Sequence, residues 1–279
     1  MEVDQHKSPA WLLESHPNYI RWERARNLSL QRGDLVFRLL KSNKINTSGI
    51  RILDLGSGEG GTSNLFSKNN FLVSLDISLN RLSRQKDEES FNKINGDAEY
   101  LPFKDDSFDL IIMQDVIEHV YQPKKLINGI NRILKKNGNI YLSTPNRFSI
   151  FNIVADPHWG LPLLSLFKRN VIKKYFLQNF RKNETGRKDI AELYSLPRLK
   201  KLFTEYYSLN LCTNESLELL FNGHKGIVWS NFHLRLIKII KILNLAGVIK
   251  TISNNRFGLI NIFFTPTFYI ILNRKQGVI

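Results

Sequence analysis

Between residues 51 and 145, short apolar segments alternate with segments suited to helices, and this alternation restricts the possible folds more than any other feature. Strands are predicted at 51–56, 71–76, 91–95, 108–113 and 139–144, and helices at 60–69, 79–90 and 123–136. The last of these helices is expected to end at Asn137-Gly138, a typical C-cap. Continuous apolar strands joined by helices are typical of a parallel sheet covered on both faces. The pattern therefore predicts a doubly wound, Rossmann-like α/β fold.

The alternation stops after Pro145, and the rest of the chain predicts a sheet interrupted by two helical insertions. The insertions are expected at 146–195 and 214–260. A helix at 197–204 and a strand at 206–213 lie between them, and a last strand at 266–272 is predicted at the edge, beside the sixth. These strands complete a mostly parallel, seven-stranded sheet. Residues 46–279 would form this domain.

Residues 1–45 are predicted to form a helical N-terminal cap. Apolar side chains recur at helical spacing between residues 8 and 42. Pro17 and Gly33 are expected to break this helical region into pieces.

A glycine-rich turn follows the first predicted strand, in the segment Asp54-Leu-Gly56-Ser-Gly58-Glu-Gly60-Gly61. Glycines at these positions permit a sharp turn and a close approach of the backbone to a ligand, as at dinucleotide sites. Asp54 argues against a dinucleotide, since its carboxylate would repel a pyrophosphate. It would attract a ligand that carries an ammonium group and no phosphate, such as S-adenosylmethionine.

Three further polar elements follow successive strands. They are Asp76 after the second strand, Asp97 and Ala98 after the third, and Gln114 in the run Met113–His119 after the fourth. In this order and spacing the four elements resemble the class I S-adenosylmethionine-dependent methyltransferases. The likeness is greatest to the ubiquinone-biosynthesis-type group (methyltransferase type 11), through the runs 97–109 and 116–120, and it covers residues 50–145.

The resemblance implies S-adenosylmethionine as cofactor and assigns its contacts. The methionine end would be held by Asp54, Gly56, Ser57, Gly58 and Gly60. The ribose and adenine would be held by Asp76, Ile77, Asp97 and Ala98, with Gln114 lining the floor.

Two histidines are the candidates for catalysis. Methyl transfer is an in-line displacement that needs an aligned acceptor, and a general base helps where a hydroxyl must lose its proton. His119 follows the fourth strand, and His158 lies in the first insertion. The alternatives are that His119 fixes the local helix or contacts a lid, and that His158 belongs to a turn. No metal ligand is predicted.

The charge of the chain bears on its partners. Forty Lys and Arg against 25 Asp and Glu give a net charge of +15. Such an excess favours an anionic partner, unless it is a general lysine-rich background. An RNA methyltransferase is one alternative, but no Asn/Asp-Pro-Pro-aromatic motif follows the fourth strand, so nucleic acid is not the expected partner. A non-catalytic binding protein is another, disfavoured by the intact turn and acids. The expected reaction is O-methylation of a small-molecule, glycan or lipid-linked acceptor.

Residues 230–249 predict a helix with a broad apolar face and only basic charge opposite, at Arg235, Lys238 and Lys241. A similar segment spans Leu163–Lys174 and includes Arg169. Such helices can lie on an anionic membrane surface; the alternative is that they pack on the domain or in a dimer. With one cysteine, no visible secretory signal and no membrane span, we expect a cytoplasmic protein, and the basic helices would allow it to lie on the inner face of a membrane. The oligomeric state is not predicted.

Overall fold

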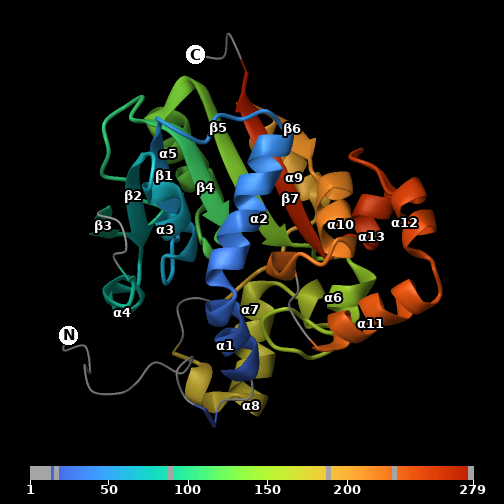
Figure 1. Ribbon diagram of the computed structural model, residues 1–279. Helices are drawn as coiled ribbons and strands as arrows, with labels where there is room; N and C mark the ends of the chain where they lie inside the picture. Colours follow the sequence, from blue (N-terminus) through green and yellow to red (C-terminus); the bar gives the residue numbers. More distant parts are fainter. Residues whose placement is uncertain (1–13, 16–18, 87–90, 187–189, 228–230, 276–279) are drawn as a thin grey trace.

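The computed structural model describes residues 14–15, 19–86, 91–186, 190–227 and 231–275. Its centre is one seven-stranded sheet in the order β3-β2-β1-β4-β5-β7-β6. The strands are β1 (Arg51–Leu55), β2 (Phe71–Asp76), β3 (Asn92–Asn95), β4 (Phe108–Gln114), β5 (Leu134–Pro145), β6 (Tyr207–Leu211) and β7 (Thr267–Arg274). The strands β1 to β5 pair in parallel, whereas β7 is antiparallel to both β5 and β6. The predicted doubly wound, mostly parallel sheet is confirmed (Figure 1).

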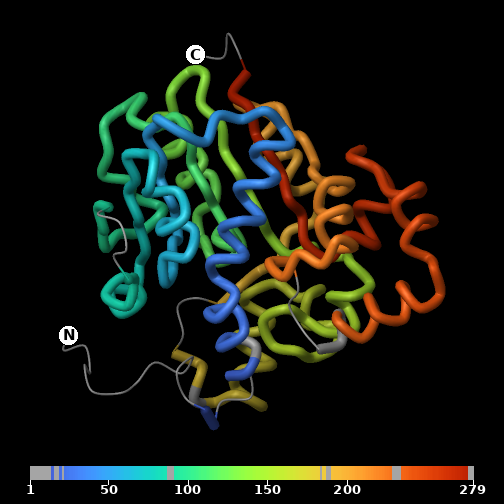
Figure 2. Tube along the Cα trace, viewed as in Figure 1, coloured from blue at the N-terminus to red at the C-terminus, as the bar shows by residue number. Residues whose placement is uncertain are grey.

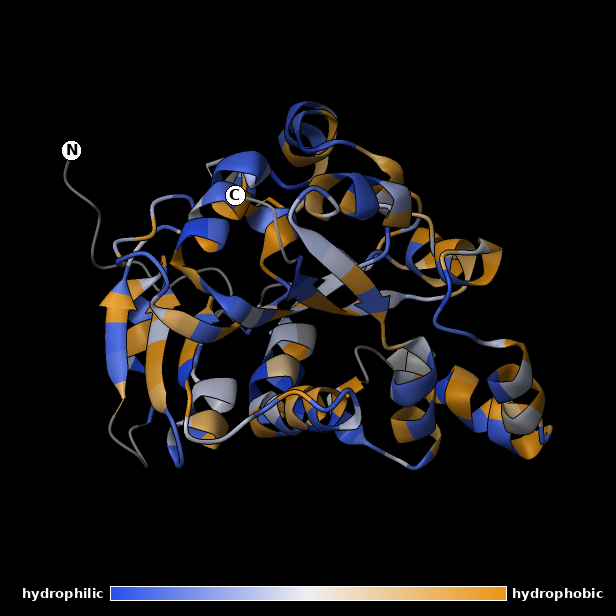
Figure 3. Ribbon diagram, turned by 90° about the horizontal axis from the view of Figure 1, so that it is seen from above, coloured by the Kyte–Doolittle hydropathy of each residue, from blue (hydrophilic) through white to orange (hydrophobic). Residues whose placement is uncertain are grey.

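Helices cover both faces of this sheet, as the view from above shows (Figure 3). The helices that belong to the sheet domain are α2 (Ser29–Ser42), α3 (Gly61–Ser67), α4 (Leu79–Ser83), α5 (Pro123–Ile133), α9 (Leu196–Phe203) and α10 (Thr213–Phe221). A short α1 (Tyr19–Asn27) precedes α2, and the 3-10 turn η2 (Ile117–His119) follows β4.

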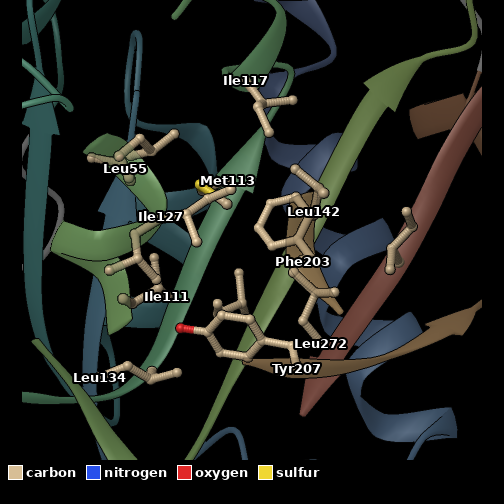
Figure 4. Packing of buried hydrophobic residues seen from close by; sticks show 14 of the residues in the cluster. Leu55, Ile111, Met113, Ile117, Ile127, Leu134, Leu142, Phe203, Tyr207 and Leu272 are labelled. Atoms are coloured by element: carbon tan, nitrogen blue, oxygen red, sulfur yellow. The ribbon is translucent and has the colours of Figure 1, made fainter. Parts of the chain in front are cut away.

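Each face of the sheet has its own buried cluster. On one face, Leu35, Val36, Leu39 and Leu40 of α2 pack with side chains of the strands. On the other face, residues of α5 and α9, such as Ile127 and Phe203, pack against the alternate side chains of the same strands (Figure 4). Helix α2 therefore forms part of the layer that covers the sheet.

The first insertion is a set of short helical turns with a small core of its own. It contains α6 (Ile150–Val154), η3 (Leu164–Leu166), α7 (Arg169–Val171), the π-helix η4 (Ile172–Leu177), α8 (Gln178–Phe180) and η5 (Lys182–Glu184). Its core consists of Trp159, Leu164, Ile172, Phe176, Leu177 and Ile190.

The second insertion lies at the periphery of the molecule (Figure 1). It contains the turn η6 (Lys225–Ile227) and the helices α11 (Asn231–Ile242), α12 (Ala246–Ile252) and α13 (Leu259–Phe263). Within the described residues, no helix combines the length and apolar character needed to cross a membrane.

Several local expectations were wrong. The strand predicted at the edge, β7, lies between β5 and β6, and β6 is the edge strand. Burial agrees with this order: six consecutive residues of β7 are buried, as suits a strand inside the sheet, whereas β6 alternates between buried and exposed residues, as suits an edge strand. The helix predicted to end at Asn137-Gly138 ends at Ile133. The Asn-Gly pair lies within β5, in an irregular stretch where its register to β4 shifts.

Two predicted helices also differ. Gly33 lies within an unbroken α2. Its place there is explained by the close packing of α2 on α3, because a Cβ at Gly33 would lie 3.0 Å from the Cα of Thr62. The break falls at Leu28 instead; Pro17 lies outside the described residues. The helix predicted over 230–249 is two helices, α11 and α12, separated by a turn in which Asn244 has a positive φ of 53°.

Candidate active site

A cavity of about 340 Å³ lies outside the carboxyl ends of β1 and β4. Ligands bind at this edge in open α/β sheets. Its walls come from α1, the start of α2, the glycine turn, the segment after β4 and the first insertion. Figure 2 shows α1 and the first insertion side by side at this end of the molecule. The predicted residues that line it are Gly56, Ser57, Gly58, Gly60, Gln114, His119 and His158.

The glycine turn between β1 and α3 has the conformation that its sequence predicts. Gly56, Gly58 and Gly60 all have positive φ. Gly56 admits no side chain, since a Cβ there would lie 2.4 Å from a methyl carbon of Val116. A Cβ on Gly58 would meet nothing within 4 Å, so the backbone of the turn is open at this point. The turn thus offers peptide groups to a ligand at close range.

Buried side chains hold this turn from behind. The hydroxyls of Ser74 and Ser57 share a hydrogen bond of 2.6 Å, and Gln85 Nε2 donates to the carbonyl of Gly58 over 2.7 Å. Gln85 also donates to Ser57 Oγ and accepts from Ser74. Neither Gln85 nor Ser74 carried a signal in the sequence, since both lie in ordinary strand and helix contexts.

Asp54 lies beneath the turn and does not line the cavity. Its carboxylate is buried and accepts a 2.6 Å hydrogen bond from the hydroxyl of Ser63. Burial, together with the nearby carboxylate of Asp76, raises the pKa of this carboxyl to about 7. A cation in the cavity would favour its charged form.

Asp76 is buried at the end of β2 and faces the same turn. Its carboxylate accepts the backbone N–H of Gly58 and that of Ser78, each over 2.8 Å. The side chain of Ile77, next to it, is 71% exposed.

Asp97 and Ala98 follow β3, away from the walls of the cavity. The Asp97 carboxylate accepts the backbone N–H of Glu99, and Ala98 packs against the core. The structure therefore brings the turn, Gln114 and the two histidines together around one cavity, and it places Asp54, Asp76, Ile77, Asp97 and Ala98 outside the residues that line it.

Three contacts hold Gln114 and Asp115, which line the cavity, to neighbouring elements. The hydroxyl of Thr62 donates to Gln114 Oε1 over 2.5 Å. The guanidinium of Arg32, in α2, pairs with the Asp115 carboxylate at 2.6 Å, and the Ser143 hydroxyl donates to the other carboxylate oxygen. Asp115 has a positive φ of 55°, which the short polar side chain of Asp tolerates better than most. Arg32 was missed because its partner is 83 residues away.

Glu118, His119 and His158 form a polar cluster at the insertion side of the cavity. The rings of the two histidines meet edge to face, with centroids 5.2 Å apart. Glu118 is fully buried, and the Thr144 hydroxyl donates to its Oε2 over 2.9 Å. Burial raises the pKa of Glu118 well above its usual value, and the charge of Asp115 adds to this. Glu118 was missed because a buried acid next to a histidine has no signature of its own.

The two segments that carry the cluster are held by buried polar groups. Arg169 of the first insertion donates to the carbonyls of Glu118 and Val120 over 2.8 and 3.1 Å, and to the carbonyl of Ile190 over 2.7 Å. Its guanidinium also lies over the ring of Tyr121. Arg169 is buried, so its assignment to a membrane-facing stripe was wrong: the backbone carbonyls around His119 hold it inside.

His158 lies in a turn, which was the alternative to a catalytic role in the sequence analysis. It also lines the cavity. The Asp156 carboxylate accepts the backbone N–H groups of His158 and Trp159, each over 2.8 Å. Such side-chain to backbone bonds are typical of Asx turns.

These residues fit S-adenosylmethionine. The cavity has the size of a small-molecule site, and one end of it is open glycine backbone. Negative charge from Asp54 and Asp76 lies behind that backbone, on the side expected for an ammonium group. Arg24, Arg26 and Arg81 also line the cavity and bring positive charge to its walls.

Comparison with known proteins gives the same assignment. Residues 53–142 match a family described as "Methyltransferase domain". An uncharacterized protein of Methanocaldococcus jannaschii is 38% identical over 143 residues, which cover 50% of this chain and 60% of that protein. The UbiE ubiquinone/menaquinone biosynthesis C-methyltransferase of Wigglesworthia glossinidia brevipalpis is 34% identical over 103 residues, 33% of this chain and 41% of that enzyme.

The chain covers less than two thirds of the length of the curated relatives that it matches. Among solved structures, the plantazolicin methyltransferase BpumL in complex with SAH has a TM-score of 0.54 at 16% identity, covering 96% of this chain and 94% of that one. A Mesorhizobium loti S-adenosylmethionine-dependent methyltransferase has a TM-score of 0.51 at 14% identity, covering 85% and 95%. These two likenesses concern the fold. The matched family model identifies a methyltransferase domain at residues 53–142, and this part of the chain resembles the class I S-adenosylmethionine-dependent methyltransferases, whose cofactor, S-adenosylmethionine, fits the cavity.

Proposed function

We propose that this chain methylates a hydroxyl oxygen of a small-molecule, glycan or lipid-linked acceptor. The bound cofactor supplies an electrophilic methyl group on a sulfonium. The observation that carries the proposal is the layout of the cavity, with the glycine turn at one end and the polar cluster Glu118, His119 and His158 at the other. A hydroxyl needs help to lose its proton as it attacks, and imidazole and carboxylate groups give that help.

The chain's own part is to bind and orient. Gly56, Gly58 and Asp76 would hold the cofactor, and Gln114 would form the floor beneath its methionine moiety. The contacts of Asp76 with the turn suggest that it sets the turn's shape as well as the ribose contact. His119 and His158 would face the acceptor oxygen.

Calorimetry with S-adenosylhomocysteine tests the cofactor site. Asp76→Ala should weaken binding by about 1.5–3 kcal/mol, the scale of a hydrogen bond to a charged group, which is about 10- to 150-fold. Asp105→Ala is the matched control, since Asp105 is 73% exposed and only pairs with Arg132 at the surface. Tight NAD binding, or equal affinity in the two variants, would contradict the assignment.

Kinetics test the polar cluster, once a screen of hydroxyl acceptors gives turnover. His119→Ala should lower kcat by about 100-fold or more with little change in affinity for S-adenosylhomocysteine. A loss of less than about tenfold in a folded variant would return His119 to a structural role. Copurification of RNA that resists nuclease treatment would instead favour the RNA methyltransferase alternative.

A second observation suggests where the acceptor is met. The helices α11–α13 and their connections expose many large apolar side chains. They are Leu234, Ile239, Ile242, Leu243, Leu245, Val248, Ile252, Phe257, Leu259, Phe263 and Phe264. Lys238, Lys241 and Lys250 are exposed on the same helices. Phe232, which the sequence of segment 230–249 also predicts on its apolar face, has a side chain outside the described residues. We propose that this surface rests on an anionic membrane, which would suit a lipid-linked acceptor.

Flotation with vesicles tests the membrane proposal. The chain should float with anionic vesicles at low salt, less at high salt, and not with neutral ones. Lys238→Glu with Lys241→Glu should abolish flotation. Lys124→Glu with Lys136→Glu, at two exposed lysines outside α11–α13, makes the same change of charge and should have a much smaller effect. No flotation on anionic vesicles at low salt would refute the proposal.

A further inference from the structure

Three potential metal ligands converge in the polar cluster. One carboxylate oxygen of Glu118 and one ring nitrogen each of His119 and His158 all lie within 4.8 Å of one another. A first-row divalent ion holds such atoms at about 2.0–2.2 Å, which puts them roughly 3–3.5 Å apart around it. The remaining gap is at most about 1.8 Å, a distance on the scale of side-chain rotations.

The carboxylate of Glu118 has one oxygen in need of a partner. Its Oε2 accepts from Thr144, but Oε1 is buried and has no hydrogen-bond partner among the described residues. Buried polar atoms are nearly always satisfied, because an unsatisfied one costs its full desolvation. Glu118 is also fully buried, whereas an acid without a bound partner is normally at the surface. A cation beside Oε1 accounts for both facts.

The ligands are also held in advance. Arg169 donates to the carbonyls on both sides of His119, those of Glu118 and Val120. The carboxylate of Asp156 fixes the backbone of the turn that presents His158. Supporting contacts of this kind orient ligands at metal centres. A pair of surface histidines that met by chance would not need two buried charged residues to position their backbones.

We propose that Glu118, His119 and His158 bind one divalent first-row transition-metal ion, and that the acceptor hydroxyl takes an open position on it. Two imidazoles and one carboxylate suit such ions and leave positions for exogenous oxygen. This inference rests on the proposed function and refines it, since the histidines then act as ligands and not as free bases. The metal would lower the pKa of the hydroxyl. The O–H bond breaks and its proton passes to solvent, the O–C bond forms at the methyl carbon, and the C–S bond breaks to leave a neutral thioether.

Titration of chelator-treated full-length chain with Co²⁺ tests the site, with visible absorption and calorimetry as readouts. We expect one ion per chain and the absorption of Co²⁺ bound by nitrogen and oxygen. His119→Ala and His158→Ala should each weaken binding by at least about tenfold. Glu118→Gln should do so too, while keeping an acceptor for Thr144. No binding at millimolar Co²⁺, or an affinity in all three variants equal to that of the unchanged chain, would overturn the proposal.

His224→Ala is the matched control. His224 also faces a carboxylate, that of Asp34 at 3.0 Å, but this pair lies outside the cavity. The variant should bind Co²⁺ as the unchanged chain does, and a loss equal to that of His158→Ala would refute the assigned ligands. Methyl transfer that is undiminished in excess chelator would overturn the activation of the acceptor.

Parallel titration with S-adenosylhomocysteine separates the two proposals. A chain that binds S-adenosylhomocysteine through Asp76 but takes up no Co²⁺ would refute the metal site alone. A chain that binds no S-adenosylhomocysteine would refute the proposed function, whatever it does with Co²⁺. The same titration checks that each histidine variant is folded, since the cofactor end of the cavity is untouched.

Discussion

Substituting Gly61 by alanine would test how closely α2 must approach α3 for the cavity to form. A Cβ on Gly61 would lie 2.4 Å from the carbonyl carbon of Ser29 and 2.6 Å from its oxygen. These are backbone atoms, so no flexible side chain can yield and α2 itself must shift. Overpacking of this kind costs about 1–3 kcal/mol, reduced by up to about 1 kcal/mol for the better helix propensity of alanine. We therefore expect the free energy of unfolding to fall by about 1–2 kcal/mol.

The assay is urea unfolding followed by circular dichroism, with linear extrapolation to water. The control is Gly247→Ala in α12, where a Cβ would meet nothing within 4 Å, so this variant should gain roughly 0.5–1 kcal/mol. Because Leu28, Ser29 and Arg32 line the cavity, the shift of α2 should also weaken binding of S-adenosylhomocysteine several-fold. Equal stability of the two variants, with unchanged binding, would refute the claim that this contact fixes the cavity wall.

Two further predictions concern buried titratable groups. Burial raises the pKa of Asp54 from 3.8 to about 7, so between these values the folded chain holds a proton that the unfolded chain has lost, and stability falls as pH rises through this window. Urea unfolding of the cofactor-free chain measures this effect. Between pH 5 and 8, the free energy of unfolding of the wild type should fall by about 2–3 kcal/mol relative to that of Asp54→Asn. If the difference in free energy between the two chains does not change with pH, the prediction is wrong. Burial also raises the pKa of the Cys212 thiol to about 12, so an aromatic disulfide reagent at pH 8 should react with it only as the chain unfolds, and fast reaction in the native state would disprove this.

The sheet and the glycine turn could be predicted because their signals are local. The strands β1, β2 and β4 are short, mostly apolar runs, and the glycines at 56 and 58 indicate a turn that needs positive φ. The position of β7 could not be predicted from its sequence in the same way. An apolar strand shows that it is buried on both faces, but not which neighbours bury it.

Only part of the site could be predicted from local sequence patterns. The rest depends on contacts between segments that are distant in the sequence. His119 and His158 could be named from their places after a strand and within an insertion. Their meeting depends on Arg169, which is 51 residues from Glu118 and reads in the sequence as one more basic residue of a helix. The burial of Arg169 follows from three backbone carbonyls that only the folded chain brings together.

The same arginine bears on how chains of this type could be re-engineered. Acceptor choice in such a fold would be altered by exchanging the first insertion between relatives. Here that graft would remove the donor that satisfies the carbonyls of Glu118 and Val120, and it would loosen the loop that presents His119. A chimera would therefore lose turnover for every acceptor, old or new, unless the donor segment brings an arginine at the position of Arg169. Crossover points in recombination libraries should therefore lie after Arg169 in the sequence. The loop after β4 and Arg169 would then always come from the same parent.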